Sequence, residues 1–402
     1  MNFKDLNLDE HIISSLQALG YETPSPIQQK AIPYLLEGRD VFGCAQTGTG
    51  KTAAFALPIL QLLHRNTVHR KGIKALILAP TRELAIQIGE SFTDYGKGLK
   101  IKHTVIFGGV SQLNQTQALG RGVDVLIATP GRLLDLMNQG FIRLDTIEFF
   151  VLDEADRMLD MGFIHDIKKI IPKLPKKRQT MFLSATVPEE IRSLANSLLT
   201  DPVRVEVTPV SSPVEMIKQR VLYVEKSEKK TALHSLITEE KIEHALIFTR
   251  TKHGADKVAK ELSRQGIKAE AIHGNKSQNA RQRALAGFKD RTVKILVATD
   301  IASRGIDVDK LSHVINFELP EVPETYIHRI GRTGRAGEAG IAISLCSTEE
   351  LTYLRDINKL VKNVIDEMNA PPVVSRSSSP APAAKSNQRS SARPPQRRFA
   401  RR

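Results

Sequence analysis

The glycine-rich segment Ala45–Thr52 lies between an apolar run and an amphipathic stretch. A phosphate-binding loop occupies this strand-to-helix position, because backbone N–H groups at a helix N-terminus surround phosphate oxygens. Gly48 and Gly50 permit the turn, Lys51 is placed for the β- and γ-phosphates, and the Thr52 hydroxyl is placed for Mg²⁺. The pattern usually begins with glycine, but alanine is compatible because the first position does not cradle phosphate. The segment therefore predicts an α/β fold with a phosphate-binding edge.

Short β-rich runs alternate with longer amphipathic stretches along most of the chain. The expected strands of the first half are Asp40–Cys44, Ala75–Ala79, His103–Phe107, Val123–Ala128, Phe149–Leu152 and Thr180–Leu183. Those of the second half are His244–Phe248, Ala269–Ile272, Lys294–Val297, His313–Phe317 and Ile341–Leu345. Helical patterns lie between them, for example over Thr52–Leu63 and Thr81–Gly96. Continuously apolar runs are typical of parallel strands buried on both faces, and the alternation predicts parallel α/β sheets.

A proline- and serine-containing stretch, Asp201–Pro213, separates the two halves and has the composition of a linker. We expect a first domain over 1–207, a linker over 208–214 and a second domain over 215–368. No sequence repeat relates the halves, so any similarity between them would be a similarity of fold.

Composition excludes several classes of protein. With 41% apolar and 25% charged residues, the chain can bury a sizeable core. No apolar run approaches the roughly 18 residues of a membrane helix, and the N-terminus lacks an apolar signal segment. Two cysteines, Cys44 and Cys346, cannot form a disulfide framework or a four-ligand zinc site, and we expect both to be buried. These features favour a cytoplasmic protein.

An acidic pair follows the apolar run Phe149–Leu152. Ligands bind at the carboxyl ends of strands in α/β sheets, so Asp153 and Glu154 are expected at the same edge as the phosphate loop. Phosphoryl transfer needs one carboxylate near Mg²⁺ and a group that orients or deprotonates the attacking water. Asp153 suits the first role and Glu154 suits the second.

A basic cluster, His328–Arg335, lies near the end of the second half. If this stretch is helical, Arg332 and Arg335 share a face because they are three positions apart. Planar guanidinium groups suit the charge that develops on a transferred phosphate. These arginines would complete the site only when the two domains close. A surface cluster that contacts a nucleic-acid backbone is the alternative.

Taken together, these segments resemble one family, the DEAD-box RNA helicases, whose name-giving tetrapeptide stands at 153–156. The resemblance covers nearly all of residues 1–368. The matching segments are Gln28, Ala45–Thr52, Pro80–Ala85, Thr129–Arg132, Asp153–Asp156, Ser184–Thr186, Ala298–Asp307 and His328–Arg335. The short N-terminus and Arg157–Phe163 are similar to the bacterial RhlE-like branch. The resemblance implies two tandem RecA-like (P-loop NTPase) domains with parallel sheets, and ATP with Mg²⁺ between them.

The resemblance also implies roles for single residues around ATP. It implies adenine recognition by Gln28, whose amide can pair with a donor and an acceptor, with Tyr21 and Phe3 stacking. It further implies that Ser184 and Thr186 couple ATP hydrolysis to closure of the domains. The implied ATP contacts are Phe3, Tyr21, Gln28, Ala45, Gln46, Thr47, Gly48, Thr49, Gly50, Lys51, Thr52 and Asp307.

RNA contacts carry over to both halves of the chain. They are Pro80, Thr81, Arg82, Gly109, Thr129, Gly131, Arg132, Thr249, Arg250, Gln278, Arg281, Thr299 and Arg304. Backbone, hydroxyl and guanidinium donors bind phosphates and 2′-hydroxyls without reading bases, so little sequence specificity is expected. Structural ion pairs are the alternative for Arg82 and Arg132. Ser25 stands where the family usually has threonine, and Ser303 stands where it often has alanine. Neither difference should affect the activity.

The implied activity is RNA-stimulated ATP hydrolysis coupled to domain closure and local unwinding of short duplexes, or remodelling of ribonucleoproteins. Two alternatives remain: an ATP-gated RNA clamp with little unwinding, and a DNA translocase of the same architecture. Ribosomal or RNA-degradation partners are compatible with the family, and no membrane is expected.

The net charge of +14 is unevenly spread, because eight basic residues and no acid lie within 371–402. A segment of this composition cannot bury enough apolar surface to offset its ordering entropy. We therefore expect residues 369–402 to form a disordered basic tail. It would act as an electrostatic tether for RNA, or alternatively as a solubilising extension with no RNA role.

Overall fold

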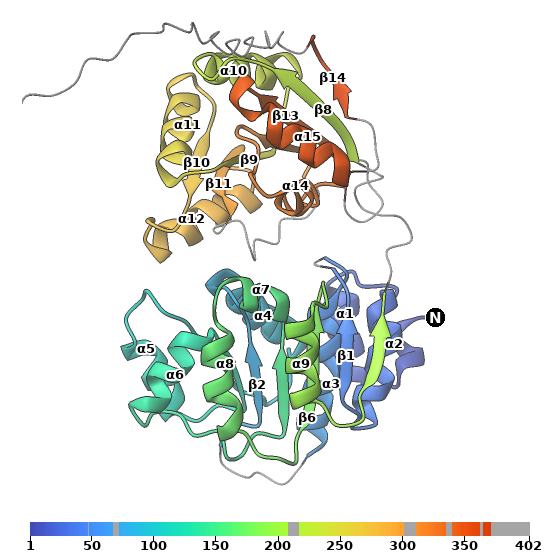
Figure 1. The fold of residues 1–402 in the computed structure, drawn as a ribbon. Coiled ribbons are helices and arrows are strands. Elements are labelled where there is room, and N and C mark those ends of the chain that lie inside the picture. Colours follow the sequence, from blue (N-terminus) through green and yellow to red (C-terminus); the bar gives the residue numbers. More distant parts are fainter. Residues whose placement is uncertain are drawn as a thin grey trace, which may run out of the picture.

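The computed structural model describes residues 1–46, 48–66, 72–207, 217–300, 311–334, 340–361 and 365–370. Two α/β domains lie one above the other, and each contains a seven-stranded sheet flanked by helices (Figure 1). The predicted linker and residues 371–402 of the predicted tail lie outside the described residues. Within the described ranges, no helix has both the length and the apolar character needed to cross a membrane.

The first sheet is parallel throughout and has the strand order β3-β4-β2-β5-β6-β1-β7. Its strands are β1 (Val41–Cys44), β2 (Ala75–Leu78), β3 (His103–Ile106), β4 (Val125–Ala128), β5 (Phe149–Leu152), β6 (Gln179–Ser184) and β7 (Val203–Glu206). The six predicted strands are confirmed, with small shifts at their ends. Strand β7 was not predicted, because this edge strand is largely exposed and is not an apolar run.

Helices cover both faces of the first sheet. One core cluster packs α1 (Glu10–Ala18), α2 (Pro26–Leu36), α3 (Lys51–Arg65) and α4 (Arg82–Tyr95) against the sheet. The other packs α6 (Pro130–Asn138), α7 (Ala155–Asp160), α8 (Ile164–Ile170) and α9 (Glu189–Leu198). The remaining elements are α5 (Leu113–Gly120), η1 (Phe3–Leu6) and η2 (Ile171–Lys173). Apolar residues on one side of each helix produce this arrangement.

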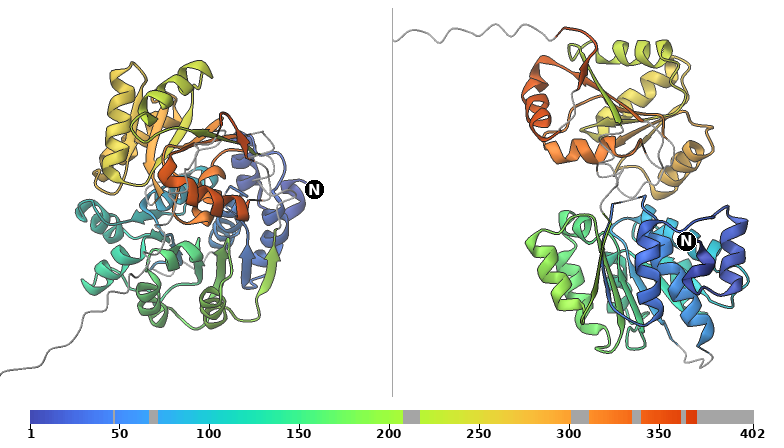
Figure 2. Two further views of the ribbon diagram at one scale, coloured as in Figure 1. Left: turned by 45° about the horizontal axis from the view of Figure 1, so that its top comes forward. Right: turned by 90° about the vertical axis from the view of Figure 1, so that its right-hand side faces the viewer.

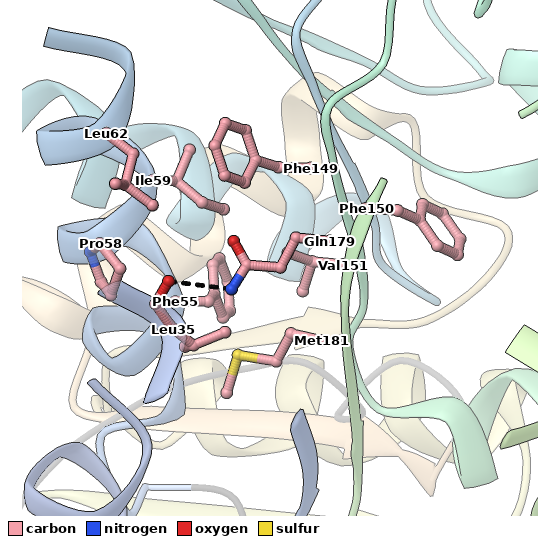
Figure 3. A pocket seen from close by; sticks show the side chains of 10 residues that line it. All are labelled: Leu35, Phe55, Pro58, Ile59, Leu62, Phe149, Phe150, Val151, Gln179 and Met181. Atoms are coloured by element: carbon pink, nitrogen blue, oxygen red, sulfur yellow. Dashed lines mark hydrogen bonds between the residues drawn. The ribbon is translucent and has the colours of Figure 1, made fainter. Parts of the chain in front are cut away.

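A small interior cavity lies between α2, α3 and the sheet (Figure 3). The Gln179 amide donates to the Leu35 carbonyl in the last turn of α2 at 2.9 Å and to the Arg39 carbonyl in the following connection at 2.8 Å. Apolar side chains such as Phe55 and Met181 surround this amide. The cavity of about 10 Å³ is too small for a ligand, so it is a packing defect.

The second sheet repeats the first, with the strand order β10-β11-β9-β12-β13-β8-β14. Its strands are β8 (Ile217–Tyr223), β9 (Ala245–Thr249), β10 (Ala269–Ile272), β11 (Ile295–Thr299), β12 (His313–Asn316), β13 (Gly340–Cys346) and β14 (Asp366–Glu367). Numbered within its own domain, each strand occupies the same position as in the first sheet. The two halves therefore share a fold without a sequence repeat, as expected.

Helices α10 (Lys229–Glu239) and α11 (Lys252–Arg264) cover one face of the second sheet. Helices α12 (Gln278–Lys289), α14 (Pro323–Ile330) and α15 (Leu351–Leu360) lie on the other, and η4 (Thr348–Glu350) precedes α15. Helices α4 and α7 of the first domain face α12 and α14 of the second (Figures 1 and 2). The carboxyl ends of both sets of strands consequently point toward the boundary between the domains.

Candidate functional site

Three predicted segments meet where neighbouring strands of the first sheet end. The phosphate loop follows β1, Ser184 ends β6, and Asp153 follows β5. The Ala45 N–H donates to the Ser184 carbonyl at 3.1 Å, and the Asp153 N–H donates to the Leu78 carbonyl at 3.0 Å. Because β5, β6 and β1 are adjacent in the sheet, the predicted ATP residues gather on one half of its edge.

The phosphate loop has the backbone that its sequence predicts. Gly48 and Gly50 have φ of 81° and 89°, a region that favours glycine, and α3 begins immediately afterwards at Lys51. The Lys51 ammonium is buried and donates to the Ala45 carbonyl at 2.9 Å, so it folds back over the loop. Thr47 lies outside the described residues.

The Gln28 side chain is hydrogen-bonded to the phosphate loop. Its amide oxygen accepts from the Ser25 N–H at 2.8 Å, and its amide nitrogen donates to the Gly50 carbonyl at 3.1 Å. The Ser25 hydroxyl donates to the Thr49 carbonyl at 2.7 Å, so serine fulfils a hydroxyl role here. Gln28 is therefore buried against the loop, and its role in adenine recognition stays a prediction.

The two aromatic residues predicted to stack on adenine differ in exposure. Phe3 is 4% exposed and belongs to the core of the first domain, whereas Tyr21 is 40% exposed. Their rings meet edge to face at 6.4 Å, and the Tyr21 hydroxyl lies 3.2 Å from that of Tyr95. In this arrangement only Tyr21 presents a ring to solvent.

Asp153 has the properties of a cation ligand. Its side chain is buried, and Oδ1 has no hydrogen-bond partner among the described residues. The pKa of Asp153 is raised to about 6, mainly by burial and also by the neighbouring Glu154, while the nearby Lys51 ammonium acts in the opposite direction. A carboxylate and the Thr52 hydroxyl are hard oxygen donors, which fits Mg²⁺ held largely by water and phosphate oxygens. No group of three His, Cys, Asp or Glu side chains that could hold a metal occurs in the described part of the chain.

Glu154 adopts an uncommon backbone conformation at the start of α7. Its φ of 55° and ψ of 52° lie in the left-handed region, which costs a non-glycine residue about 1–3 kcal/mol. Arg157 donates to its carboxylate at 2.7 Å, and both side chains are largely buried. The strained backbone coincides with the residue proposed to act on water.

Asp156 connects α7 to the segment after β6. Its Oδ2 accepts from the Thr186 N–H at 2.8 Å, from the Thr186 hydroxyl at 3.0 Å and from the Ala185 N–H at 3.1 Å. The Ser184 hydroxyl donates to the Thr186 carbonyl at 2.7 Å. The predicted coupling residues thus contact the acidic motif, and their coupling role stays a prediction.

The helix expected to carry Arg332 and Arg335 ends at Ile330, so the shared helical face was wrong. Arg332 lies in the following turn, where its N–H donates to the Arg329 carbonyl at 3.2 Å. The chain then forms a bridge between Thr333 and Leu311, which a continued helix would not allow. Arg335 and Asp307 lie outside the described residues.

Arg332 nevertheless lies at the boundary between the domains. It lines a cavity of about 30 Å³ together with Arg157 and Asp160 of the first domain. Arg329, which was not singled out from the sequence, is fully buried and pairs with Asp300 at 2.6 and 2.8 Å. Arg329 therefore has a structural role.

The predicted RNA residues of the first domain occupy the other half of its edge, after β2, β3 and β4. The Thr81 hydroxyl caps α4 by accepting from the Leu84 N–H. Arg82 lies against Gly109, where an added Cβ would meet its guanidinium at 2.2 Å. Arg132 donates to the Val110 carbonyl at 3.2 Å. The remaining predicted residues here are Pro80, Thr129 and Gly131, all near the same strand ends.

Arg132 also pairs with Asp135 across one helical turn at 3.5 Å. This bond supports the structural alternative for Arg132. Its Nη1 atom is buried and has no hydrogen-bond partner among the described residues, so these bonds do not satisfy the whole guanidinium.

Predicted RNA residues from the two domains bond to one another. Arg82 donates to the Gln278 amide oxygen at 3.2 Å, and the Gln278 amide donates to Glu83 at 3.0 Å. Arg281 pairs with the other oxygen of Glu83 at 3.1 Å. Burial and the nearby Arg281 lower the pKa of Arg82. Glu83 was not among the predicted site residues, although it lies inside the matching segment Pro80–Ala85.

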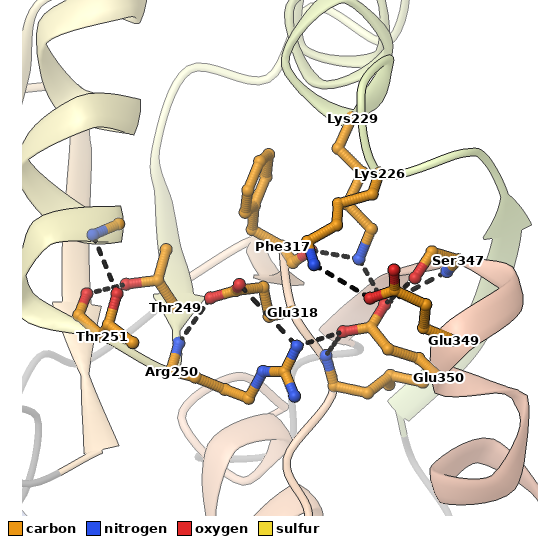
Figure 4. Close-up of polar contacts among 12 residues, drawn as sticks. Lys226, Lys229, Thr249, Arg250, Thr251, Phe317, Glu318, Ser347, Glu349 and Glu350 are labelled. Atoms are coloured by element: carbon orange, nitrogen blue, oxygen red, sulfur yellow. Dashed lines mark hydrogen bonds and ion pairs between the residues drawn. The ribbon is translucent and has the colours of Figure 1, made fainter.

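The end of β9 carries Thr249 and Arg250 (Figure 4). The Thr249 hydroxyl donates to the Thr251 carbonyl at 3.1 Å. The guanidinium of Arg250 lies 3.5 Å from both Glu321 and Glu350. Carboxylates of its own domain therefore compete with RNA for this side chain. Thr299 ends β11 in the same sheet, and Arg304 lies outside the described residues.

A buried ion pair between Lys229 and Glu350 lies next to Arg250 (Figure 4). Lys229 and Glu350 are 2% and 1% exposed, and the Lys229 ammonium also donates to the carbonyls of Phe317 and Leu345. Glu350 accepts further from the Leu319 N–H at 3.1 Å. The pair joins α10, β13, η4 and the segment that follows β12, and neither residue stands out in the sequence.

Comparison with known proteins identifies the family. The family profile of DEAD/DEAH box helicases matches residues 25–194, and that of the helicase conserved C-terminal domain matches residues 228–337. The DEAD-box ATP-dependent RNA helicase CshA of Bacillus cereus is 41% identical and covers 92% of this chain and 70% of its own length. The RNA helicase CrhR of Synechocystis is 45% identical, with 92% and 74% covered.

Solved structures agree with the sequence relatives. Dbp5 of S. cerevisiae bound to RNA and ADP BeF3 is 33% identical, with a TM-score of 0.78 and 91% of this chain and 95% of that chain covered. A DEAD box protein of Methanococcus jannaschii is 40% identical, with a TM-score of 0.54 and 92% and 99% covered. The family profiles of both domains, the sequence motifs and the relatives all indicate the same family. The protein therefore belongs to the DEAD-box family of ATP-dependent RNA helicases.

Proposed function

We propose that ATP and RNA bind to opposite halves of the same sheet edge and together draw the two domains closed, and that hydrolysis reopens them. The supporting observation is the division of the first sheet: ATP candidates follow β1, β5 and β6, whereas RNA candidates follow β2, β3 and β4. Each ligand also has candidate contacts in the second domain. Closure would bend one RNA strand away from A-form geometry and release its complement.

Hydrolysis would rest on a small set of side chains. Lys51 would leave the Ala45 carbonyl to contact the β- and γ-phosphates, and Glu154 would orient or deprotonate the attacking water. Asp153 and Thr52 would hold Mg²⁺, which neutralises phosphate charge when bound. Arg332, with Arg335, would stabilise the developing charge on the γ-phosphate, an effect worth roughly 10³–10⁵ in rate.

RNA would be held through its backbone. The candidate groups at the ends of β2, β4 and β9 are hydroxyls, guanidinium groups and backbone N–H groups. Such donors recognise phosphates and 2′-hydroxyls, so the core would show little base preference. The basic residues of 371–402 would add a non-specific, salt-sensitive contribution.

We further propose the RhlE-like branch, a cytoplasmic location and RNA substrates in ribosome assembly or RNA degradation. The branch is supported by the sequence Arg157–Phe163. We also propose that the first domain spans 1–207, the linker 208–214 and the second domain 215–368. The basic tail over 369–402 is a further proposal.

The test is steady-state ATP hydrolysis with and without single-stranded RNA, in the wild type and in Glu154→Gln. RNA stimulation in the wild type and loss of turnover in the variant are expected. Hydrolysis at the wild-type rate in Glu154→Gln would refute the role of Glu154. Strand release from many duplexes per enzyme with ATP, and from at most one duplex per enzyme with a non-hydrolysable analogue, would distinguish unwinding from RNA clamping, in which RNA is held without strand release.

Mg²⁺ is tested separately. Removal of divalent cations with EDTA should abolish hydrolysis, and Asp153→Asn should raise the Mg²⁺ concentration that restores half of each protein's maximal rate. An unchanged Mg²⁺ requirement in Asp153→Asn would contradict the assignment of this carboxylate.

A further inference from the structure

The Glu154 carboxylate is held by a side chain of its own helix. Arg157 donates from Nη1 to Glu154 Oε2 at 2.7 Å, and the two side chains are 15% and 4% exposed. Most i,i+3 ion pairs lie in water and contribute little. This one is shielded from water, and its acidic member is the residue proposed to act on water, so its geometry bears on catalysis.

Arg157 also faces the second domain. Its side chain lines the cavity of about 30 Å³ at the domain boundary, and Arg332 of the second domain lines the same cavity. A cavity of this size holds one or two water molecules. Arg157 therefore lies between the proposed catalytic carboxylate of one domain and the proposed arginine finger of the other.

The backbone at this position is fixed independently of the Arg157 side chain. The Arg157 N–H donates to Asp156 Oδ1 at 3.0 Å, and Asp156 Oδ2 accepts from the backbone of Ala185 and Thr186. Met158, the next residue, is buried in the core. Replacing the guanidinium should therefore leave α7 in place and change only what the side chain holds.

We infer that Arg157 is a positioning residue for hydrolysis: its guanidinium fixes the Glu154 carboxylate in the orientation that receives a proton from the attacking water. The inference rests on the proposed role of Glu154. Arg157 itself contacts neither ATP nor RNA in this account, so its loss should act on the chemical step. Misplacing a catalytic group by about 1 Å can cost roughly 100-fold in rate.

The chain contains a matched control for this pair. Arg192 and Glu189 in α9 have the same residue types and spacing in the same domain, but their side chains are 58% and 83% exposed. Arg157→Met and Arg192→Met remove the same charge from similar helical positions. Only the first removes a partner of the proposed catalytic carboxylate.

The experiment measures single-turnover ATP hydrolysis at saturating RNA, together with the ATP and RNA concentrations that give half-maximal rates. Arg157→Met should lower the maximal rate about 10- to 100-fold and leave both half-saturating concentrations within about threefold. Arg157→Lys should recover part of the loss because it keeps a donor and a charge. Arg192→Met should behave like the wild type, and equal melting temperatures should show that every variant is folded.

A double-mutant cycle tests whether Arg157 acts through Glu154. In the Glu154→Gln background, Arg157→Met should cause no further loss of rate, because the group that it positions is already inactive. A maximal rate unchanged in Arg157→Met, or a full second loss in the double variant, would overturn the inference. Failure of the proposed function has a different result, namely wild-type hydrolysis without RNA stimulation or a fully active Glu154→Gln.

Discussion

The bond between Arg281 and Glu83 is the clearest ion pair that joins the two domains. It is 3.1 Å long, and the side chains are 12% and 3% exposed. We consider Arg281→Met, which removes the charge and leaves much of the aliphatic side chain. When the domains are apart, both groups return to water, so the variant penalises the closed arrangement and leaves the stability of each domain nearly unchanged.

The size of the effect follows from the burial of the pair. Hydrogen bonds to charged groups contribute about 1.5–3 kcal/mol, and Gln278 still donates to Glu83 in the variant. A loss of about 2 kcal/mol corresponds to a roughly 30-fold weaker closure equilibrium. The RNA concentration for half-maximal ATP hydrolysis should rise by about this factor.

Arg281 is also a proposed RNA contact, so a double-mutant cycle with Glu83→Gln separates the two roles. Coupling of about 1–3 kcal/mol between the substitutions is expected if the bond forms in the closed state. Arg283→Met is the control, because Arg283 lies exposed on the same helix and carries the same charge. Additive effects of Arg281→Met and Glu83→Gln, or an equal effect of Arg283→Met, would refute the reasoning.

Three further predictions concern other parts of the chain. Glu350→Gln should destabilise the second domain by about 3 kcal/mol, because it leaves the buried Lys229 charge without a carboxylate, whereas Glu349→Gln alters an exposed pair and should leave the denaturant midpoint unchanged. Gly50→Ala should weaken nucleotide binding at least tenfold in a fluorescence titration, because the added Cβ would lie 2.4 Å from the Gln28 amide. Gly38→Ala is the control: its Cβ would have no neighbour within 4 Å, so it adds only backbone strain and should keep the nucleotide affinity. Deletion of 371–402 should weaken RNA binding and flatten its salt dependence while sparing turnover at saturating RNA; an unchanged salt slope would favour a purely solubilising tail.

The sequence predicted most of the fold because central parallel strands are buried on both faces. Runs such as Phe149–Leu152 are apolar throughout and need no tertiary information. The strands that were missed lie near sheet edges: β7 and β8 alternate buried and exposed residues, and β14 contains two exposed residues. Such strands owe their conformation to pairing with a neighbour, which a local pattern does not encode.

The site was predictable where local motifs specify backbone geometry and much less so where distant side chains meet. The phosphate loop and the acidic segment could be placed from their flanking strand and helix. The contacts of Gln28 with the loop, of Glu83 with the second domain and of Lys229 with Glu350 could not. Each joins residues far apart in the chain, and no spacing rule links them.

The central claim is that ATP and RNA act together to close the two domains. Its most direct measurement is energy transfer between dyes on exposed positions, Asp94 in the first domain and Lys260 in the second, in a chain without Cys44 and Cys346. We predict a high-transfer population only when a non-hydrolysable ATP analogue and single-stranded RNA are both present. With ATP in place of the analogue, this population should be lost once the ATP has been hydrolysed. The same transfer efficiency with either ligand alone, with both and with neither would contradict the account.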